Sequence, residues 1–131
     1  MDKGTRACVA FVVGSVIGSP GRTSVYDYSR STYIQFGGTV DGENVNVYDH
    51  ERGCHFSGTL PQVYDYGTGA HVSIEINGSN FSGYDFGAGH HFNGTVNGAN
   101  VQLYDFDASE YFNFQLRLDG RRGSGCTESS V

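Results

Sequence analysis

The sequence predicts an all-β fold, an antiparallel β-meander of about nine to ten short strands closed as an up-and-down barrel or a barrel-like sandwich. Three observations predict it. A Tyr-Asp-aromatic marker recurs five times along the 131 residues, Gly- and Asn-rich turn clusters separate short alternating segments, and β-branched and aromatic residues outnumber good helix formers over most of the chain. A chain of this length is expected to bury a single core.

The marker recurs at a nearly constant period, with Tyr-to-Tyr separations of 22, 16, 20 and 20 residues. Its five copies are Tyr26-Asp27-Tyr28, Tyr48-Asp49-His50, Tyr64-Asp65-Tyr66, Tyr84-Asp85-Phe86 and Tyr104-Asp105-Phe106. Such a period is typical of repeat architectures, in which each unit is one supersecondary element. Each unit of about 20 residues is therefore predicted to form one β-hairpin.

Residues 83–102 show both turns of the predicted unit. Gly87-Ala88-Gly89 follows the marker, and Asn97-Gly98-Ala99-Asn100 follows the return strand. Gly and Asn supply the positive φ angles that hairpin turns require. Comparable clusters occupy the same places in the other units, so residues 24–118 are predicted to be a hairpin-repeat domain.

Alternation along the strands predicts the face that lies in the core, because side chains two residues apart share a face. The predicted core face is apolar and ends, in each marker strand, at the marker aspartate. It comprises Val45, Val47, Asp49, Phe81, Gly83, Asp85, Val101, Leu103 and Asp105 in the marker strands, and Phe36, Val40, Phe56, Leu60, Val72, Ile74, Ile76, Phe92, Val96, Phe112, Phe114, Leu116 and Leu118 in the return strands.

The opposite face carries many aromatic and histidine side chains, bordered by Ser, Thr, Asn and Gln. An exposed aromatic patch usually marks an interaction site, and flat rings beside amides and hydroxyls suit stacking on a sugar or on another protein. The alternative is that the rings stabilise the sheet through cross-strand pairs. The predicted ligand-binding residues are Tyr48, His50, His55, Tyr64, Tyr66, His71, Tyr84, Phe86, His91, Tyr104 and Tyr111.

The marker aspartates have two interpretations. Each carboxylate precedes a turn, so it is expected to accept hydrogen bonds from turn amides. If the sheet closes, the five carboxylates also gather at one mouth of the barrel, an arrangement that would suit Ca²⁺ or an organic cation. The histidines are spread over separate hairpins, so the sequence predicts no metal-binding residues and no cofactor.

The N-terminal residues 1–23 form an apolar segment that is either a signal peptide cleaved after Gly18 or, if retained, a first strand or a plug of the barrel. Cleavage would leave Cys54 and Cys126, an even pair able to bridge in an oxidising compartment. An extracellular or cell-surface location is therefore favoured, with a cytoplasmic one as the alternative. Residues 119–131 lack periodicity and are predicted to be a flexible tail.

Composition restricts the classes of function. A net charge of -6 with dispersed basic residues argues against nucleic-acid binding, and no apolar run is long enough for a membrane span. No nucleophile elbow or Cys-x-x-Cys motif occurs, so no catalytic residue is predicted. The leading expectation is a non-enzymatic binding protein that uses its aromatic and polar outer face, or the barrel mouth, for a carbohydrate-like or small organic ligand. The alternatives are a self-assembling structural subunit of a filament or surface and, third, a metal-dependent enzyme.

Overall fold

The computed structural model describes residues 1–118, which form one helix followed by ten strands. The helix α1 spans Lys3–Ile17. The strands are β1 (Ser24–Asp27), β2 (Thr32–Asp41), β3 (Asn44–Asp49), β4 (Cys54–Thr59), β5 (Gln62–Asp65), β6 (Ala70–Asn77), β7 (Asn80–Asp85), β8 (His90–Asn97), β9 (Asn100–Asp105) and β10 (Glu110–Arg117). The predicted tail at 119–131, which includes Cys126, lies outside the described residues.

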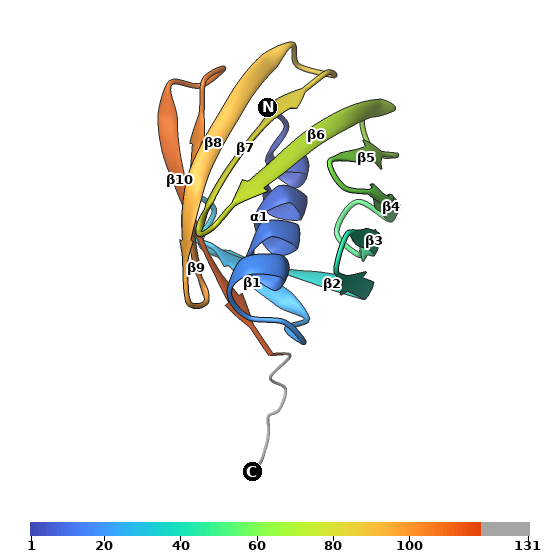
Figure 1. Cartoon of the computed structure of the whole chain (residues 1–131), viewed down its shortest axis with the longest axis vertical. Coiled ribbons are helices and arrows are strands. Elements are labelled where there is room, and N and C mark those ends of the chain that lie inside the picture. The colour runs from blue at the N-terminus through green and yellow to red at the C-terminus, as the bar shows by residue number, and fades with distance from the viewer. Residues whose placement is uncertain (119–131) are drawn as a thin grey trace.

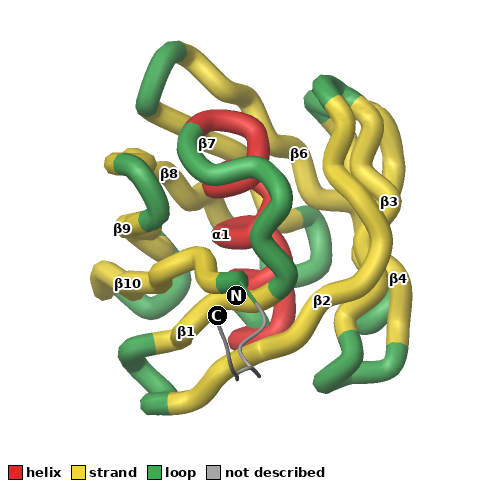
Figure 2. Tube along the Cα trace, turned by 90° about the horizontal axis from the view of Figure 1, so that it is seen from below, coloured by secondary structure: helices red, strands yellow, loops and turns green. Residues whose placement is uncertain are grey.

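The ten strands close into one antiparallel barrel. Each strand pairs with its neighbours along the chain, and β1 pairs with β10 to complete the ring, with Val25 opposite Leu116 in the closing register. Figure 1 shows the strands arranged around α1, and Figure 2 shows the ring from below. The predicted meander is confirmed in its barrel form. Closure leaves no unpaired edge among the ten described strands.

The hairpin turns alternate between the two ends of the barrel. At one end, called here the aspartate mouth, a four-residue turn follows each of Asp27, Asp49, Asp65, Asp85 and Asp105. The last residue of such a turn has a positive φ, 68° at Gly53 and 51° at Ser31, which explains the preference for glycine there. At the other end, two-residue connections such as Gly78-Ser79 join the strands. The turn chemistry of the sequence thus sets the hairpin lengths.

The core face is the one that strand alternation predicts. The apolar side chains of this face are buried in every strand, and Val40, Leu60 and Ile76, near the far end, are partly buried. Leu118 is the exception, since 62% of its surface is exposed. The prediction that Leu118 belongs to the core is wrong because β10 ends at Arg117 and the next residue has no sheet to lie on.

The helix α1 fills the interior of the barrel. The Asp2 side chain caps it by accepting hydrogen bonds from the amides of Gly4 and Thr5, and it ends before Pro20. Its residues from Ala7 to Ser15 are all buried. A helix that is apolar on all sides needs a fully enclosed position, and a ten-stranded barrel has room for it. This segment is therefore a helix and not the first strand of the sheet, and it occupies the position of a plug.

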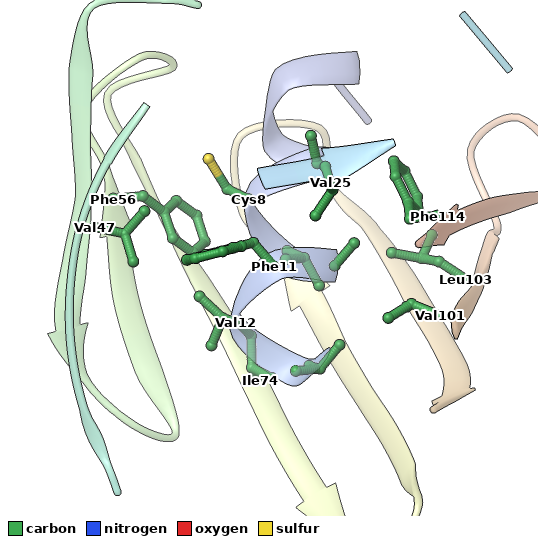
Figure 3. Packing of buried hydrophobic residues seen from close by; sticks show 14 of the residues in the cluster. Cys8, Phe11, Val12, Val25, Val47, Phe56, Ile74, Val101, Leu103 and Phe114 are labelled. Atoms are coloured by element: carbon green, nitrogen blue, oxygen red, sulfur yellow. The ribbon is translucent and has the colours of Figure 1, made fainter. Parts of the chain in front are cut away.

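Side chains of α1 contact β2 and β10, the two strands that flank β1 in the ring. Phe11 stacks on Phe36 with ring centroids 4.5 Å apart, and the Arg6 guanidinium lies 3.8 Å from the centroid of the Phe112 ring. Figure 3 shows Phe11 between the helix and Phe56. With 15 residues α1 is too short to cross a bilayer, and no helix in the described part of the chain has the length and apolarity for it.

A substitution at Gly14 tests whether α1 packs inside the barrel. A Cβ atom at this position would overlap the Leu116 side chain on β10. Gly14→Val is expected to lower the free energy of unfolding by about 1–3 kcal/mol, because the closed wall has no room for added methyl groups. The measurement is urea denaturation of Gly14→Val alone and in a Leu116→Ala background, where the cost should fall by about 1 kcal/mol or more. A helix outside the barrel would instead gain from replacement of its glycine.

Candidate functional site

Each hairpin carries three aromatic or histidine rings on its outer face beside the aspartate mouth. The marker tyrosine contacts the ring two residues later and the ring opposite it on the return strand, edge to face, with centroids 4.6–5.0 Å apart. These aromatic triads are Tyr26-Tyr28-Tyr33, Tyr48-His50-His55, Tyr64-Tyr66-His71, Tyr84-Phe86-His91 and Tyr104-Phe106-Tyr111.

Burial divides each triad into a centre and two flanks. The central tyrosines are half-buried, whereas flanking rings such as Tyr28, Tyr66, Phe86, Phe106 and Tyr111 are exposed over 47–61% of their surface. The central tyrosine therefore stabilises its hairpin through one ring contact within its own strand and one across to the return strand. The flanking rings have faces that remain open to a ligand.

The eleven residues predicted to bind a ligand all lie in four of these triads. The structure brings them together as three complete triads and, in the last hairpin, as the pair Tyr104 and Tyr111, beside which Phe106 was not predicted. Within residues 1–118 no outer-face ring contact joins one hairpin to the next, so the rings do not form a continuous column. The spacing of the marker predicts a cluster of rings in each hairpin, but it does not predict that the clusters of neighbouring hairpins are out of contact.

A hollow of the outer face lies beside Tyr28, where the first and last hairpins meet. It has a volume of about 580 Å³ and is lined by neutral side chains. Thr95, Gln102 and Asn113 form its floor as cross-strand partners, Thr95 opposite Gln102 and Gln102 opposite Asn113. Asn97 completes the polar rim. An exposed ring thus borders a row of hydroxyl and amide groups.

A second hollow repeats this arrangement one hairpin further along the barrel. It encloses about 430 Å³ beside Phe106, with Ser82, His91 and Asn93 in its lining. The two hollows share a ring beside an asparagine, Phe106 with Asn93 and Tyr28 with Asn113, whereas most of their other lining residues differ. The register at the two seams differs by two residues, because the Phe106 amide donates to the carbonyl of His91, whereas the Tyr28 amide donates to that of Asn113. A ring and an asparagine side chain therefore lie beside each other at both seams.

None of the residues that line the larger hollow belongs to the predicted site. Sequence reasoning identifies Tyr28 as a marker residue but omits it from the ligand-binding set, and it treats Asn97 and Asn100 only as turn residues. The contact between the first and last hairpins depends on closure of the barrel. The feature of the sequence that could have indicated this hollow is the outward position of Gln102 and Asn113 in their strands.

At the aspartate mouth, the inner face of the hairpins carries the marker carboxylates, all of which are buried. The Oδ1 atom of each accepts a hydrogen bond from the amide two residues later, over distances of 2.8–3.0 Å. The turn-capping interpretation is confirmed by these five bonds. The closed sheet also gathers the carboxylates at one mouth, as the alternative interpretation expects.

Cations neutralise most of these carboxylates. Arg30 Nε lies 2.8 Å from Asp27 Oδ2, and Arg52 bridges Asp49 and Asp65 at 2.7 and 3.1 Å. The remaining partners come from α1. Thr5 donates to Asp65, Arg6 lies 3.4 Å from Asp105, and the Met1 ammonium lies 3.5 Å from the same carboxylate. The N-terminal end of α1 thereby provides positive charge where the barrel concentrates negative charge.

The thiols of the barrel interior are unsuited to nucleophilic chemistry. Burial raises the pKa of the Cys8 thiol well above its ordinary value, and nearby Asp49 acts in the same direction. The pKa of the Cys54 thiol is also raised, chiefly by burial. A protonated thiol is a poor nucleophile, so neither cysteine has the microenvironment of a reactive one.

Neither similarity to known proteins nor a metal-binding cluster indicates a function for the chain. No protein-family model, curated protein or solved structure matches the chain. Among residues 1–118, no group of three or more His, Cys, Asp or Glu side chains is arranged to hold a metal ion. The assignment of function therefore depends on the outer hollows and on the mouth.

The two parts of a triad are expected to differ in their effect on stability. Tyr84→Ser removes a half-buried ring and its contacts with Phe86 and His91, and it should lower the free energy of unfolding by about 2 kcal/mol. Phe86→Ser removes one exposed ring and should cost less than about 1 kcal/mol. Chemical denaturation of the two variants measures the difference. An equal loss of unfolding free energy in the two variants would show that the central tyrosine has no greater structural role than the flanking ring.

The pH dependence of stability tests the environment of Asp85. Burial raises the pKa of this carboxyl above its ordinary value of 3.8, against the lowering effect of the Ala88 and Gly87 amides. A raised pKa in the folded state means that stability is lost as pH rises from below 3.8 through the folded pKa. Asp85→Asn should therefore be more stable than the native protein at pH 7, and this gain should disappear below pH 3.8. Urea denaturation from pH 3 to 7 measures it, and a destabilised variant at pH 7 would contradict it.

Proposed function

We propose that this protein is a non-enzymatic binding module that holds a neutral carbohydrate on its outer face. The observation that carries the proposal is the larger hollow, in which the exposed Tyr28 ring borders Thr95, Gln102 and Asn113. Its volume of about 580 Å³ lies within the range usual for small-molecule sites. The second hollow sets Ser82 and Asn93 beside the exposed Phe106 ring, together with His90 and His91, and would extend the site to a longer ligand.

The lining chemistry supports a sugar over other small molecules. A sugar ring has an apolar C–H face and an edge of hydroxyl groups, so it requires both a flat apolar surface and hydrogen-bond partners. Tyr28 supplies the flat surface, and the amides of Gln102 and Asn113 each donate and accept. The preference for a neutral ligand follows from the lining of the larger hollow, which has no ionisable acid or base.

A binding role is favoured over the other two expectations by features elsewhere in the chain. A metal-dependent enzyme would require a ligand set that residues 1–118 do not form. A self-assembling subunit that joins through strand edges would require a free edge, and the ten described strands have none. The proposal therefore assigns the exposed rings to a ligand.

The test is an array of neutral and acidic oligosaccharides followed by calorimetric titration of the neutral sugar that binds best. Tyr28→Ala and Asn113→Ala are each expected to weaken binding about tenfold, which corresponds to a loss of roughly 1.4 kcal/mol for one stacking or hydrogen-bonding contact. Both side chains lie on the surface, so the fold should be retained, as circular dichroism would verify.

The matched control is Tyr111→Ala. Tyr111 is an equally open ring, with 61% of its surface exposed, but it lines neither hollow. Its removal should leave the affinity unchanged. An array without any bound neutral sugar, or an affinity unaffected by Tyr28→Ala, would overturn the proposal.

A further inference from the structure

One carboxylate of the aspartate mouth differs from its four equivalents. The repeat places Asp27, Asp49, Asp65, Asp85 and Asp105 at the same position, each with Oδ1 bonded to a turn amide. The side chains of four of them also pair with arginine within 2.7–3.4 Å. Asp85 has only 2% of its surface exposed, yet among residues 1–118 no cation lies within 4 Å of it and no group donates a hydrogen bond to its Oδ2.

The sequence of the turn explains the missing partner. The third turn residue is Arg30 in the first hairpin and Arg52 in the second, and each donates from Nε to its own marker aspartate. In the fourth hairpin this position is Ala88. The methyl group leaves the space of a guanidinium side chain unfilled beside a buried carboxylate.

That space is a hollow at the aspartate mouth. It has a volume of about 400 Å³ and is lined by Met1, Asp2, Thr68, Asp85, Gly87, Ala88 and Asp107. Of its ionisable groups, three are carboxylates and one is the Met1 ammonium, which Asp107 already binds at 2.6 Å. His90, which is opposite Asp85 in the pairing of β7 with β8, lies 3.4 Å from Asp107. Arg52 lies 3.4 Å from Asp2, so Asp85 is the one carboxylate of this lining that has no cation within 4 Å among residues 1–118.

We propose that this hollow binds a small organic cation with a guanidinium or primary ammonium group, which donates to Asp85 as Arg30 donates to Asp27. A guanidinium matches the vacant position because its planar N–H donors suit a single carboxylate. A hard metal ion does not match, because it requires six or more oxygens and the Asp85 Oδ1 is held by the amides of Gly87 and Ala88. This site is separate from the sugar-binding hollows and does not depend on them.

The test is a titration with methylguanidinium at low ionic strength, followed through the backbone amide NMR signals of the native protein. The signals of Gly87 and Ala88, whose amides donate to Asp85, should shift and saturate. Asp85→Asn should weaken binding at least tenfold. It should remain folded, because it removes an unpaired buried charge. Tetramethylammonium, which has no N–H donor, should also bind at least tenfold more weakly.

A second pair of variants separates occupancy of the hollow from general attraction to an acidic protein. Ala88→Arg places a guanidinium where the first two hairpins have one, and it should abolish methylguanidinium binding while raising the melting temperature. Ala108→Arg, at the equivalent position of the fifth hairpin, adds the same charge beside Asp105, which Arg6 already neutralises. It should retain binding within about twofold of the native affinity.

Three outcomes would overturn the proposal. The first is that Asp85→Asn binds methylguanidinium as tightly as the native protein does. The second is that Ala88→Arg and Ala108→Arg lose the same amount of methylguanidinium affinity. The third is that the amide shifts are spread evenly over all five turns. Loss of methylguanidinium binding in Asp85→Asn with sugar binding intact would show that the two sites are independent.

Discussion

The structure depends on the need to fill the interior of a ten-stranded barrel. The inward side chains of such a ring leave a central space, and α1 occupies it with an apolar surface on every side. The small residues at the contact, such as Gly14 against Leu116, let the helix approach the wall. Because the interior is taken, a ligand has only the outer face and the mouths available. The helix also brings Thr5 and Arg6 to the buried carboxylates of one mouth.

The Tyr-Asp pair acts on both sides of the barrel wall because adjacent strand residues point to opposite faces. The tyrosine packs between two rings outside, and the aspartate caps the turn inside. One dipeptide thereby stabilises each four-residue turn from both faces. The cost is a ring of buried negative charge that the chain must neutralise, and Arg30, Arg52 and the start of α1 do so at four of the five positions.

Both proposed sites depend on positions at which the repeats differ from one another. On the outer face, asparagine follows the flanking ring in the strands at Asn93 and Asn113, whereas Ser57 and Ser73 occupy this position in two other hairpins. At the mouth, Ala88 replaces the arginine of the first two hairpins. Repetition supplies the scaffold, and single substitutions within it create a neutral groove outside and an acidic hollow at the mouth. The two differ in charge, so each is expected to select a different ligand.

The sequence by itself determined the strands, their hairpins, the core face and the capping role of the aspartates. Each of these follows from local turn chemistry and from a period of two, which neighbouring residues specify without long-range information. Only the tertiary structure decided that residues 3–17 form a helix inside the barrel, since an apolar run is compatible with a strand, a helix or a leader until its surroundings are known. Closure likewise decided the hollow beside Tyr28, which joins the first and last hairpins, and the vacancy beside Asp85, because both depend on contacts between residues far apart in the chain.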